Sequence, residues 1–312
     1  MPNNTEYLTF RYSIIKESQI HMYSKELPEI KGRVIYYAVQ KDKGDREFKR
    51  YGVDYSFIGF HYVQPRNYSK FEHDRYLIGK FAKLRHTETG VRVPGNIVSK
   101  SQDDWVGSTT VIDTHTQHIF VQKNWKLGNT EQIEKALNAG VSKAILEEFN
   151  CKVFVKGQTK ENIFWNLVNE SLYIYNLELR MVSPNILETN KKAREALKDL
   201  QNIFKQDEID VTLKNESGEL KIPIHPIEDY IEYISEGEGS WKMTKKGVEG
   251  GKKTVSSLDN IRILEIPESE APEIDIEIPE DEKETEIVMA TQRERELSLI
   301  DLFHLRRQEF HE

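Results

Sequence analysis

The chain has little sulfur chemistry and no long hydrophobic run. Its 312 residues include one cysteine, Cys151, which can form neither an internal disulfide nor a cysteine-based zinc cluster. No window reaches the ~18 consecutive apolar residues that a membrane-spanning helix requires. Residues 1–6 offer neither the basic segment nor the apolar stretch of a signal peptide. The sequence therefore predicts a cytoplasmic protein without direct membrane insertion.

The familiar motifs of catalysis and cofactor binding are also missing. There is no phosphate-binding G-x-x-x-x-G-K-[ST] loop, no G-x-G-x-x-G after a predicted strand, no G-x-S-x-G and no C-x-x-C. We therefore assign no cofactor and no catalytic residue, and we favour a protein without an active site of its own.

The apolar and aromatic content of the chain suffices for a folded core. Its charge is distributed unevenly. Apolar residues make up 38% of the sequence, and 14 Tyr and 13 Phe exclude wholesale disorder. The net charge is −8, but residues 265–288 hold eleven acidic residues against one lysine, which leaves residues 1–264 with a net charge of +3. A basic body with an acidic tail favours contact with nucleic acid, although solvated acidic tails also occur in unrelated proteins.

Alternating apolar and polar residues predict strands in the first half of the chain. Within residues 7–15, four apolar side chains share one face: Leu8, Phe10, Tyr12 and Ile14. Further strands are predicted at residues 33–39, 51–63, 76–85 and 108–112, and residues 118–122 complete a hairpin with the last of these. The first half is therefore expected to form a β-meander.

From Asn129 onward the spacing of apolar residues becomes helical. Ile133, Leu137 and Val141 recur every four residues, and Asn129 followed by Gln132 predicts a capping box at the start of a helix of about 20 residues. A strand at 152–156, a helix capped by Thr159, an amphipathic strand at 172–181 and a helix from Asn185 to about Phe204 are predicted next.

A small β-rich domain is predicted from residue 206. Strands at 209–214 and 219–224 flank a turn and are expected to pair as a hairpin. A short helix with Pro226 in its first turn and Gly237 at its end follows, then a Gly- and Lys-rich loop to Lys253 and a strand at 261–266. The predicted fold class is α+β, with a body over 1–205, this domain over 206–266, and an acidic tail with a terminal helix over 267–312.

Two residue patterns suggest metal chemistry. Asp113, His115 and His118 form D-x-H-x-x-H, a good ligand set for a divalent metal, but they surround a predicted hairpin turn where polar residues are expected anyway. Asp210 with Glu219 and Lys221 matches the D…E-x-K pattern of metal-dependent nucleases, in which two carboxylates bind magnesium and the lysine stabilises charge. Pro223 places the second strand of that pattern at a sheet edge, which disfavours a nuclease site.

The stronger indication of function comes from two patches of basic and aromatic residues rather than from a single motif. Basic groups neutralise phosphates and aromatic rings stack on bases, and the chain has two patches that combine both residue types. The candidate nucleic-acid-binding residues of the first patch are Arg66, Lys70, Arg75, Lys80, Lys83 and Arg85, and those of the second, which is rich in glycine, are Trp241, Lys242, Lys245, Lys246, Lys252 and Lys253. A solvated strand face and a flexible loop are the alternative interpretations.

Residues 152–185 read KVFVKGQTKENIFWNLVNESLYIYNLELRMVSPN. This order of a strand, a T-K-E-N helix start, a long alternating strand and a Pro-containing turn resembles the A component of the lambda Rex phage-exclusion system. The chain is also similar to uncharacterised proteins of prophages and bacterial defence islands, with Phe164-Trp165 and Ser183-Pro184-Asn185 as shared landmarks. The resemblance implies a two-lobed, homodimeric protein that binds DNA without sequence preference beside a membrane-bound partner. It supplies no catalytic residues.

The sequence thus favours a nucleic-acid-binding protein of anti-phage defence or phage exclusion, with duplex DNA as the expected ligand. The rival from another class is a metal-dependent nuclease using Asp210, Glu219 and Lys221. The third hypothesis is a non-catalytic interaction module that contacts a protein partner through residues 267–312.

Overall fold

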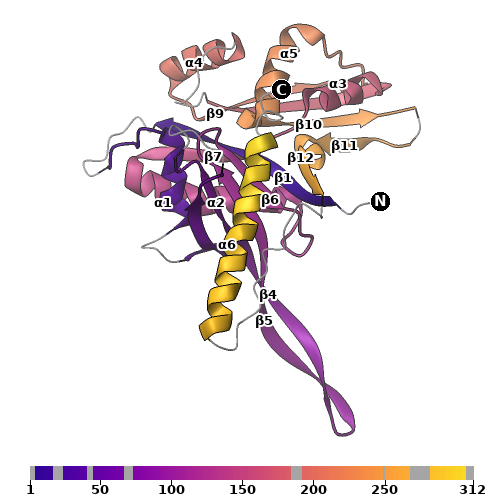
Figure 1. The fold of residues 1–312 in the computed structure, drawn as a ribbon. Helices are drawn as coiled ribbons and strands as arrows, with labels where there is room; N and C mark the ends of the chain where they lie inside the picture. The colour runs from indigo at the N-terminus through magenta and orange to yellow at the C-terminus, as the bar shows by residue number, and fades with distance from the viewer. Residues whose placement is uncertain are drawn as a thin grey trace.

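The computed structural model describes residues 4–16, 24–40, 45–66, 73–183, 192–248, 250–267 and 282–306. Within these residues the protein consists of an eight-stranded sheet, a separate four-stranded sheet and the helices packed against them (Figure 1). This arrangement confirms the predicted α+β class and the strand-rich first half of the chain.

The large sheet has the strand order β12-β1-β6-β5-β4-β3-β2, and β7 pairs with the second half of β1. Its strands are β1 (Asn4–Lys16), β2 (Arg46–Arg50), β3 (Val53–Val63), β4 (Tyr76–Val93), β5 (Asn96–Asp113), β6 (His118–Gln122), β7 (Cys151–Gly157) and β12 (Ile263–Pro267). Neighbouring strands from β2 to β6 are antiparallel, which confirms the meander. The half-buried β1 expected from its alternation is buried on both faces, because helices cover both sides of the sheet.

One face of the large sheet is covered by α2 (Thr130–Phe149) and the short α1 (Ile35–Val39). The predicted capping box is present: the side-chain oxygen of Asn129 accepts a hydrogen bond from the Gln132 amide at 2.9 Å, and the Gln132 side chain accepts one from the Asn129 amide at 3.1 Å. The apolar stripe of α2 packs with Phe57 and Phe81 of the sheet in the main hydrophobic core. Local capping and periodicity therefore suffice to define this helix.

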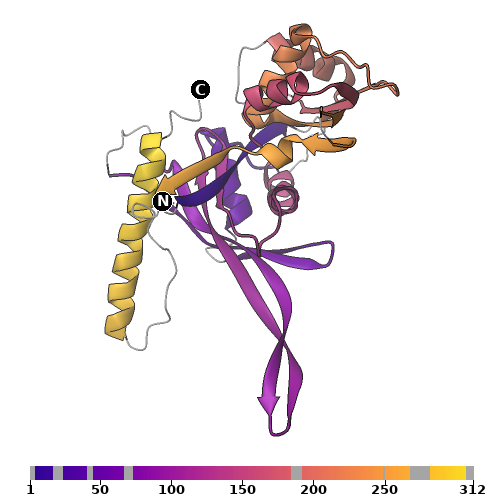
Figure 2. The same cartoon turned by 90° about the vertical axis from the view of Figure 1, so that its right-hand side faces the viewer.

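The opposite face is covered by α6 (Glu282–Leu305) (Figure 2). The sequence predicts a terminal helix in the last twenty residues, and the observed helix begins about ten residues earlier. Its Leu299, Ile300 and Phe303 are buried in a second core with Tyr7 and Tyr76 of the sheet. Alongside this core, the His61 ring lies 3.0 Å from a carboxylate oxygen of Glu296. Across the described segments, no helix combines the length and the apolar character needed to cross a membrane.

β4 and β5 extend beyond the sheet as a two-stranded arm (Figures 1 and 2). Their register is continuous from the Tyr76–Asp113 pair to the Val93–Asn96 pair, where Pro94 and Gly95 form the turn and Gly95 has a φ of +80°. Three apolar side chains near the tip are 40–70% exposed: Val91, Ile97 and Val98. The arm thus presents apolar surface outside any core of the described chain.

The small sheet has the order β11-β10-β8-β9. Its strands are β8 (Tyr173–Val182), β9 (Glu208–Lys214), β10 (Gly239–Lys246) and β11 (Lys253–Ser256), and α3 (Glu161–Asn169), α4 (Lys192–Phe204) and α5 (Ile224–Tyr233) pack with it. The shared core contains Phe164, Leu197 and Ile231 from the helices together with Leu177 and Met243 from the strands. The predicted start of the third helix at Asn185 lies outside the described residues.

Two local predictions are wrong. Residues 33–39, predicted as a strand, form a 3₁₀ turn over Lys31–Val34 followed by α1, because the buried residues Val34, Ile35 and Ala38 follow the spacing of a helix that packs on α2. Thr159 does not cap α3: the cap position is Lys160 without a side-chain bond, and Thr159 instead bridges to Ile261. Short apolar runs are ambiguous in this way until their packing partner is known.

The predicted hairpin of residues 209–214 and 219–224 also does not form. After β9, the turn through Gly218, which has a φ of +85°, brings Glu219 beside Ile174 of β8 rather than back along β9. The segment predicted as a Gly- and Lys-rich loop instead forms the β10–β11 hairpin.

The two sheets divide the chain differently from the predicted segments 1–205 and 206–266. β8, from the first segment, belongs to the small sheet, and β12, from the second, pairs with β1.

The two sheets meet just before β10, where Gly237 has a left-handed backbone conformation (φ +84°). Gly237 packs against Arg11 so closely that a Cβ at this position would lie 2.7 Å from the Arg11 Cβ. Arg11 reaches Glu238 at 3.6 Å, and both side chains are buried. This buried pair ties the two sheets together.

Candidate nucleic-acid interface

The first predicted patch does not form one surface. Arg66 contacts α6: its guanidinium lies 2.7 Å from Asp301 and 2.6 Å from Glu294. These carboxylates balance its charge and make it a docking contact for the helix. Lys70 lies outside the described residues.

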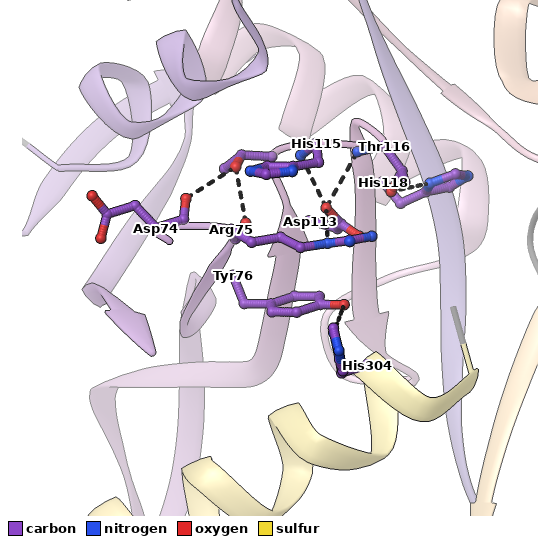
Figure 3. A network of polar contacts seen from close by, with 9 residues as sticks. Asp74, Arg75, Tyr76, Asp113, His115, Thr116, His118 and His304 are labelled. Atoms are coloured by element: carbon purple, nitrogen blue, oxygen red, sulfur yellow. Dashed lines mark hydrogen bonds and ion pairs between the residues drawn. The ribbon is translucent and has the colours of Figure 1, made fainter. Parts of the chain in front are cut away.

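Arg75 is buried in a network at the end of β4 (Figure 3). Its guanidinium donates to Asp113, with a closest distance of 2.6 Å, and the same carboxylate accepts backbone hydrogen bonds from His115 and Thr116 at 2.9 and 3.2 Å. Burial alone would raise the pKa of Asp113, but the charge and hydrogen bonds of Arg75 and the Thr116 amide hold that pKa below its ordinary value. Asp113 therefore closes the β5–β6 turn and neutralises Arg75, and both side chains are buried away from the surface.

Lys80, Lys83 and Arg85 remain partly exposed on β4. Strand alternation puts Lys83 and Arg85 on one face and Lys80 on the other. The Lys83 ammonium lies 3.4 Å from the carbonyl of Leu127, just before α2. Lys80 lines a separate cavity of about 210 Å³ beside Trp125. The three cations therefore do not form a continuous patch.

Two members of the second patch are core residues. Trp241 is 2% exposed and meets Phe164 edge to face at 5.4 Å, so its ring is not available for stacking on a base. Lys245 is also 2% exposed, and its ammonium donates to the Leu167 carbonyl at 2.9 Å. Burial lowers the pKa of Lys245. Both residues point to the helix-covered side of the small sheet.

The remaining lysines define the opposite side, here called the outer face. β10 alternates strictly: Trp241, Met243 and Lys245 are buried, while Lys242, Thr244 and Lys246 are not. Register extends this face across the neighbouring strands, because residues directly opposite one another share a face. The residues opposite the exposed positions of β10 are Glu178, Asn176 and Tyr173 on β8 and Ser256 and Thr254 on β11. On β9, the residues opposite Asn176, Glu178 and Arg180 are Lys214, Thr212 and Asp210.

Two tyrosines on the outer face were assigned to the wrong side by the sequence pattern. Uninterrupted alternation in residues 172–181 predicts that Tyr173 and Tyr175 share a face with the buried Leu177 and Leu179. A register shift in the β8–β10 pairing instead buries Ile174 together with Leu177, and Tyr173 becomes 42% exposed. The Lys252 ammonium lies 4.1 Å from the centre of the Tyr175 ring, which places this lysine on the same face. A β-bulge reverses the side-chain parity of a strand and leaves no clear signal in a single sequence.

One end of the outer face forms a wall of a cleft of about 570 Å³. Arg180, Lys242 and Asp210 line this wall, and α2 provides the opposite wall with Glu134 and Lys135. Arg180 binds Asp210 with two hydrogen bonds of 2.8 Å, and this contact lowers the pKa of Asp210. The buried Glu134 accepts a hydrogen bond from the Gly157 amide at 2.7 Å, and burial raises its pKa. The cleft is polar and carries charges of both signs.

The residues of the D…E-x-K pattern are not brought together. Asp210 lies opposite Arg180, whereas Glu219 bridges to Ile174, six residues away along β8, or about 20 Å at 3.3 Å per residue. Asp210 is also occupied by Arg180. Among the residues that the structure describes, no group of three or more His, Cys, Asp or Glu side chains is placed to hold a metal ion. The geometry gives the nuclease alternative no support.

Comparison with protein-family models and with curated proteins finds no match to this chain.

Proposed function

We propose that the protein binds nucleic acid without sequence preference through the outer face of the small sheet. The observation that supports this function is a collection of cations on one face of the small sheet, of which Lys246 is half-buried and the others are exposed: Arg180, Lys214, Lys242, Lys246 and Lys252. The acidic residues on the same face are Glu178, Glu208 and Asp210. Asp210 pairs with Arg180, and Glu208 lies 3.4 Å from the Lys156 ammonium. The face therefore carries excess positive charge, although the whole chain is acidic.

The chemistry of this face favours phosphates over base edges. Lysine is a point charge on a flexible stem and recognises a phosphate without the planar, two-pronged geometry with which arginine reads guanine. Affinity is then dominated by counterion release and falls steeply with salt. DNA is the ligand favoured by the resemblance of residues 152–185.

The Lys242→Gln, Lys246→Gln double variant tests the proposal. Each lost phosphate contact is expected to reduce the slope of log affinity against log salt by about one, so the double variant loses up to about two units. The measurement is fluorescence anisotropy with random-sequence DNA at several salt concentrations, in EDTA to remove divalent metals.

A matched double variant, Lys49→Gln with Lys143→Gln, removes two exposed lysines from the large-sheet body. It should leave the slope unchanged. An equal reduction by both double variants would mean that general charge, rather than the outer face, attracts the DNA.

A cytoplasmic role in phage exclusion or anti-phage defence is the physiological part of the proposal. It is supported by the resemblance of residues 152–185, which also implies a membrane-bound partner. The apolar side of α6 is buried on the large sheet, so a partner that uses this side of the helix must first undock it. If DNA binding serves defence, the Lys242→Gln, Lys246→Gln variant should lose protection in a plaque assay while the control double variant keeps it.

We also propose that the protein forms a homodimer and that the arm contributes to the contact. The arm between Leu84 and Trp105 carries three cations (Arg85, Arg92, Lys100) and three carboxylates (Glu88, Asp103, Asp104), a balance that disfavours nucleic acid as its ligand. Isolated two-stranded ribbons are marginally stable, and this one exposes 70% of Ile97. Ile97→Asp is expected to shift the molar mass measured by light scattering from dimer to monomer. Thr89→Asp, a polar site on the same arm, is the control.

A further inference from the structure

We infer that the outer face takes unpaired nucleotides, with the tyrosines of β8 as a stacking platform. This inference rests on the proposed function and specifies its substrate class. The platform consists of Tyr173, Tyr175, Lys246 and Lys252. It lies at the end of the outer face remote from the cleft, because Arg180 of the cleft and Tyr173 of the platform are at opposite ends of the same strand.

The platform combines aromatic rings with cations at short range. Tyr173 is 42% exposed, and its ring centre lies 6.5 Å from that of Tyr175, with an angle of 32° between the ring planes. Lys246 is directly opposite Tyr173 in the β8–β10 register, and the Lys252 ammonium is 4.1 Å from the Tyr175 ring centre. A phosphate and its attached base can thus meet a lysine and a tyrosine at the same place.

The turn before Glu219 packs closely against both tyrosines. The Ile174 amide donates to the Gly218 carbonyl at 2.8 Å, and the Asn215 amide donates to the Tyr175 carbonyl at 2.9 Å. A Cβ on Gly218 would lie 2.9 Å from the Tyr173 Cβ and from an edge carbon of the Tyr175 ring, so the turn fits closely against both residues only because it has glycine there. A ring held in place loses less entropy when a base stacks on it.

A duplex cannot use such a platform, because its base faces are already stacked inside the helix. Unpaired nucleotides expose those faces, and stacking on aromatic side chains is tolerant of sequence, in agreement with the proposed lack of sequence preference. Four-stranded antiparallel sheets with helices on the other side suit this mode because adjacent rings lie on a nearly flat surface. Lysines without aromatic neighbours would bind duplex and single strands through phosphates alone.

The cations continue along the sheet from the platform. Lys214 and Lys242 follow on the outer face, and Arg180 stands at the cleft. Tyr173 and Arg180 are seven residues apart, about 23 Å along a strand. At the ~3.4 Å spacing of stacked bases this path accommodates at most about seven nucleotides. A 12-nucleotide probe is therefore long enough to fill it.

The test compares Tyr173→Ala, Tyr173→Phe and wild type in anisotropy titrations with labelled dT12, U12 and a 12-base-pair duplex. Tyr173→Ala is expected to weaken binding of dT12 by roughly 5- to 150-fold, the loss of one base–aromatic stack, and to leave duplex binding unchanged. Tyr173→Phe keeps the ring and should restore affinity. The dT12 and U12 probes distinguish unpaired DNA from RNA.

Tyr37→Ala is the matched control, because Tyr37 is 41% exposed and has Lys25 at 5.1 Å from its ring centre, but it lies on α1. It should bind all three probes like wild type. If wild type binds neither single strands nor duplex, the proposed function itself fails. If it binds nucleic acid but Tyr173→Ala affects dT12 and U12 no more than Tyr37→Ala does, the function stands and the stacking inference is overturned.

Discussion

Replacing Asp113 by asparagine is expected to lower the free energy of unfolding by about 3–5 kcal/mol, the cost of breaking a buried ion pair on one side. The side chains of Asp113 and Arg75 are 4% and 7% exposed, so the variant removes a carboxylate charge from beside a buried cation. Asparagine keeps an oxygen that accepts from the His115 and Thr116 amides, so the β5–β6 turn is preserved. Urea unfolding followed by circular dichroism measures the loss.

Acid should produce the same loss in the wild-type protein. The pKa of Asp113 is lower in the folded chain than in the unfolded chain, so the stabilisation is complete above the unfolded pKa of about 3.9 and disappears as the pH falls through the folded value. The stability difference between wild type and Asp113→Asn should therefore be constant above about pH 5 and shrink below about pH 4.

Asp54→Asn is the control for this prediction. Asp54 pairs with Lys49 at 3.3 Å, but the two side chains are 35% and 64% exposed, and such surface pairs contribute about 0–1 kcal/mol. If Asp113→Asn costs no more than Asp54→Asn, the Arg75–Asp113 pair is hydrated in solution and the buried network of Figure 3 is refuted.

Phe303→Ala is expected to destabilise the protein by about 3–5 kcal/mol, the usual cost of truncating a buried phenylalanine. Phe303 is 1% exposed and meets Tyr7 edge to face at 5.2 Å and Phe120 at 4.8 Å. Its loss leaves a cavity between α6 and the large sheet. Urea unfolding measures the total effect, and hydrogen exchange of the α6 amides shows whether the helix detaches before the sheet unfolds.

Met289→Ala on the same helix provides the comparison, because Met289 is 58% exposed and its truncation should change stability by less than about 0.5 kcal/mol. Equal, small effects of both substitutions would show that α6 does not dock on the sheet in solution. Its apolar stripe would then be free for a protein partner, which is the interaction-module hypothesis for residues 267–312.

Local signals in the sequence determined much of the secondary structure. The Asn129–Gln132 capping box and the four-residue spacing after it define α2. The spacing of Leu297, Ile300 and His304 predicts a helix in the last twenty residues, which corresponds to the second half of α6. Alternation located β1, β6 and β8 closely. These features depend on residues within a turn or two of one another, so a single sequence contains them.

The sequence predicted only part of the candidate interface. Composition drew attention to Lys242, Lys246 and Lys252, which do lie on the outer face, but it grouped them with Trp241 and Lys245, whose side chains point into the core. It also joined Arg75 to a surface patch although Arg75 is buried against Asp113. Adjacent residues of a strand face opposite sides of a sheet, so a patch defined by sequence proximity mixes two faces.

Contacts between residues far apart in the sequence determined how the elements pack and pair. The pairing of β12 with β1 across some 250 residues, the docking of α6 through Arg66 and Phe303, and the bulge that turns Tyr173 outward all depend on which segments meet. Their energies come from burial and charge pairing between parts of the chain whose local patterns are independent of one another. Composition and periodicity therefore determined most of the elements and the presence of clustered lysines, and the tertiary structure determined which side chains, aromatic ones included, share a surface with them.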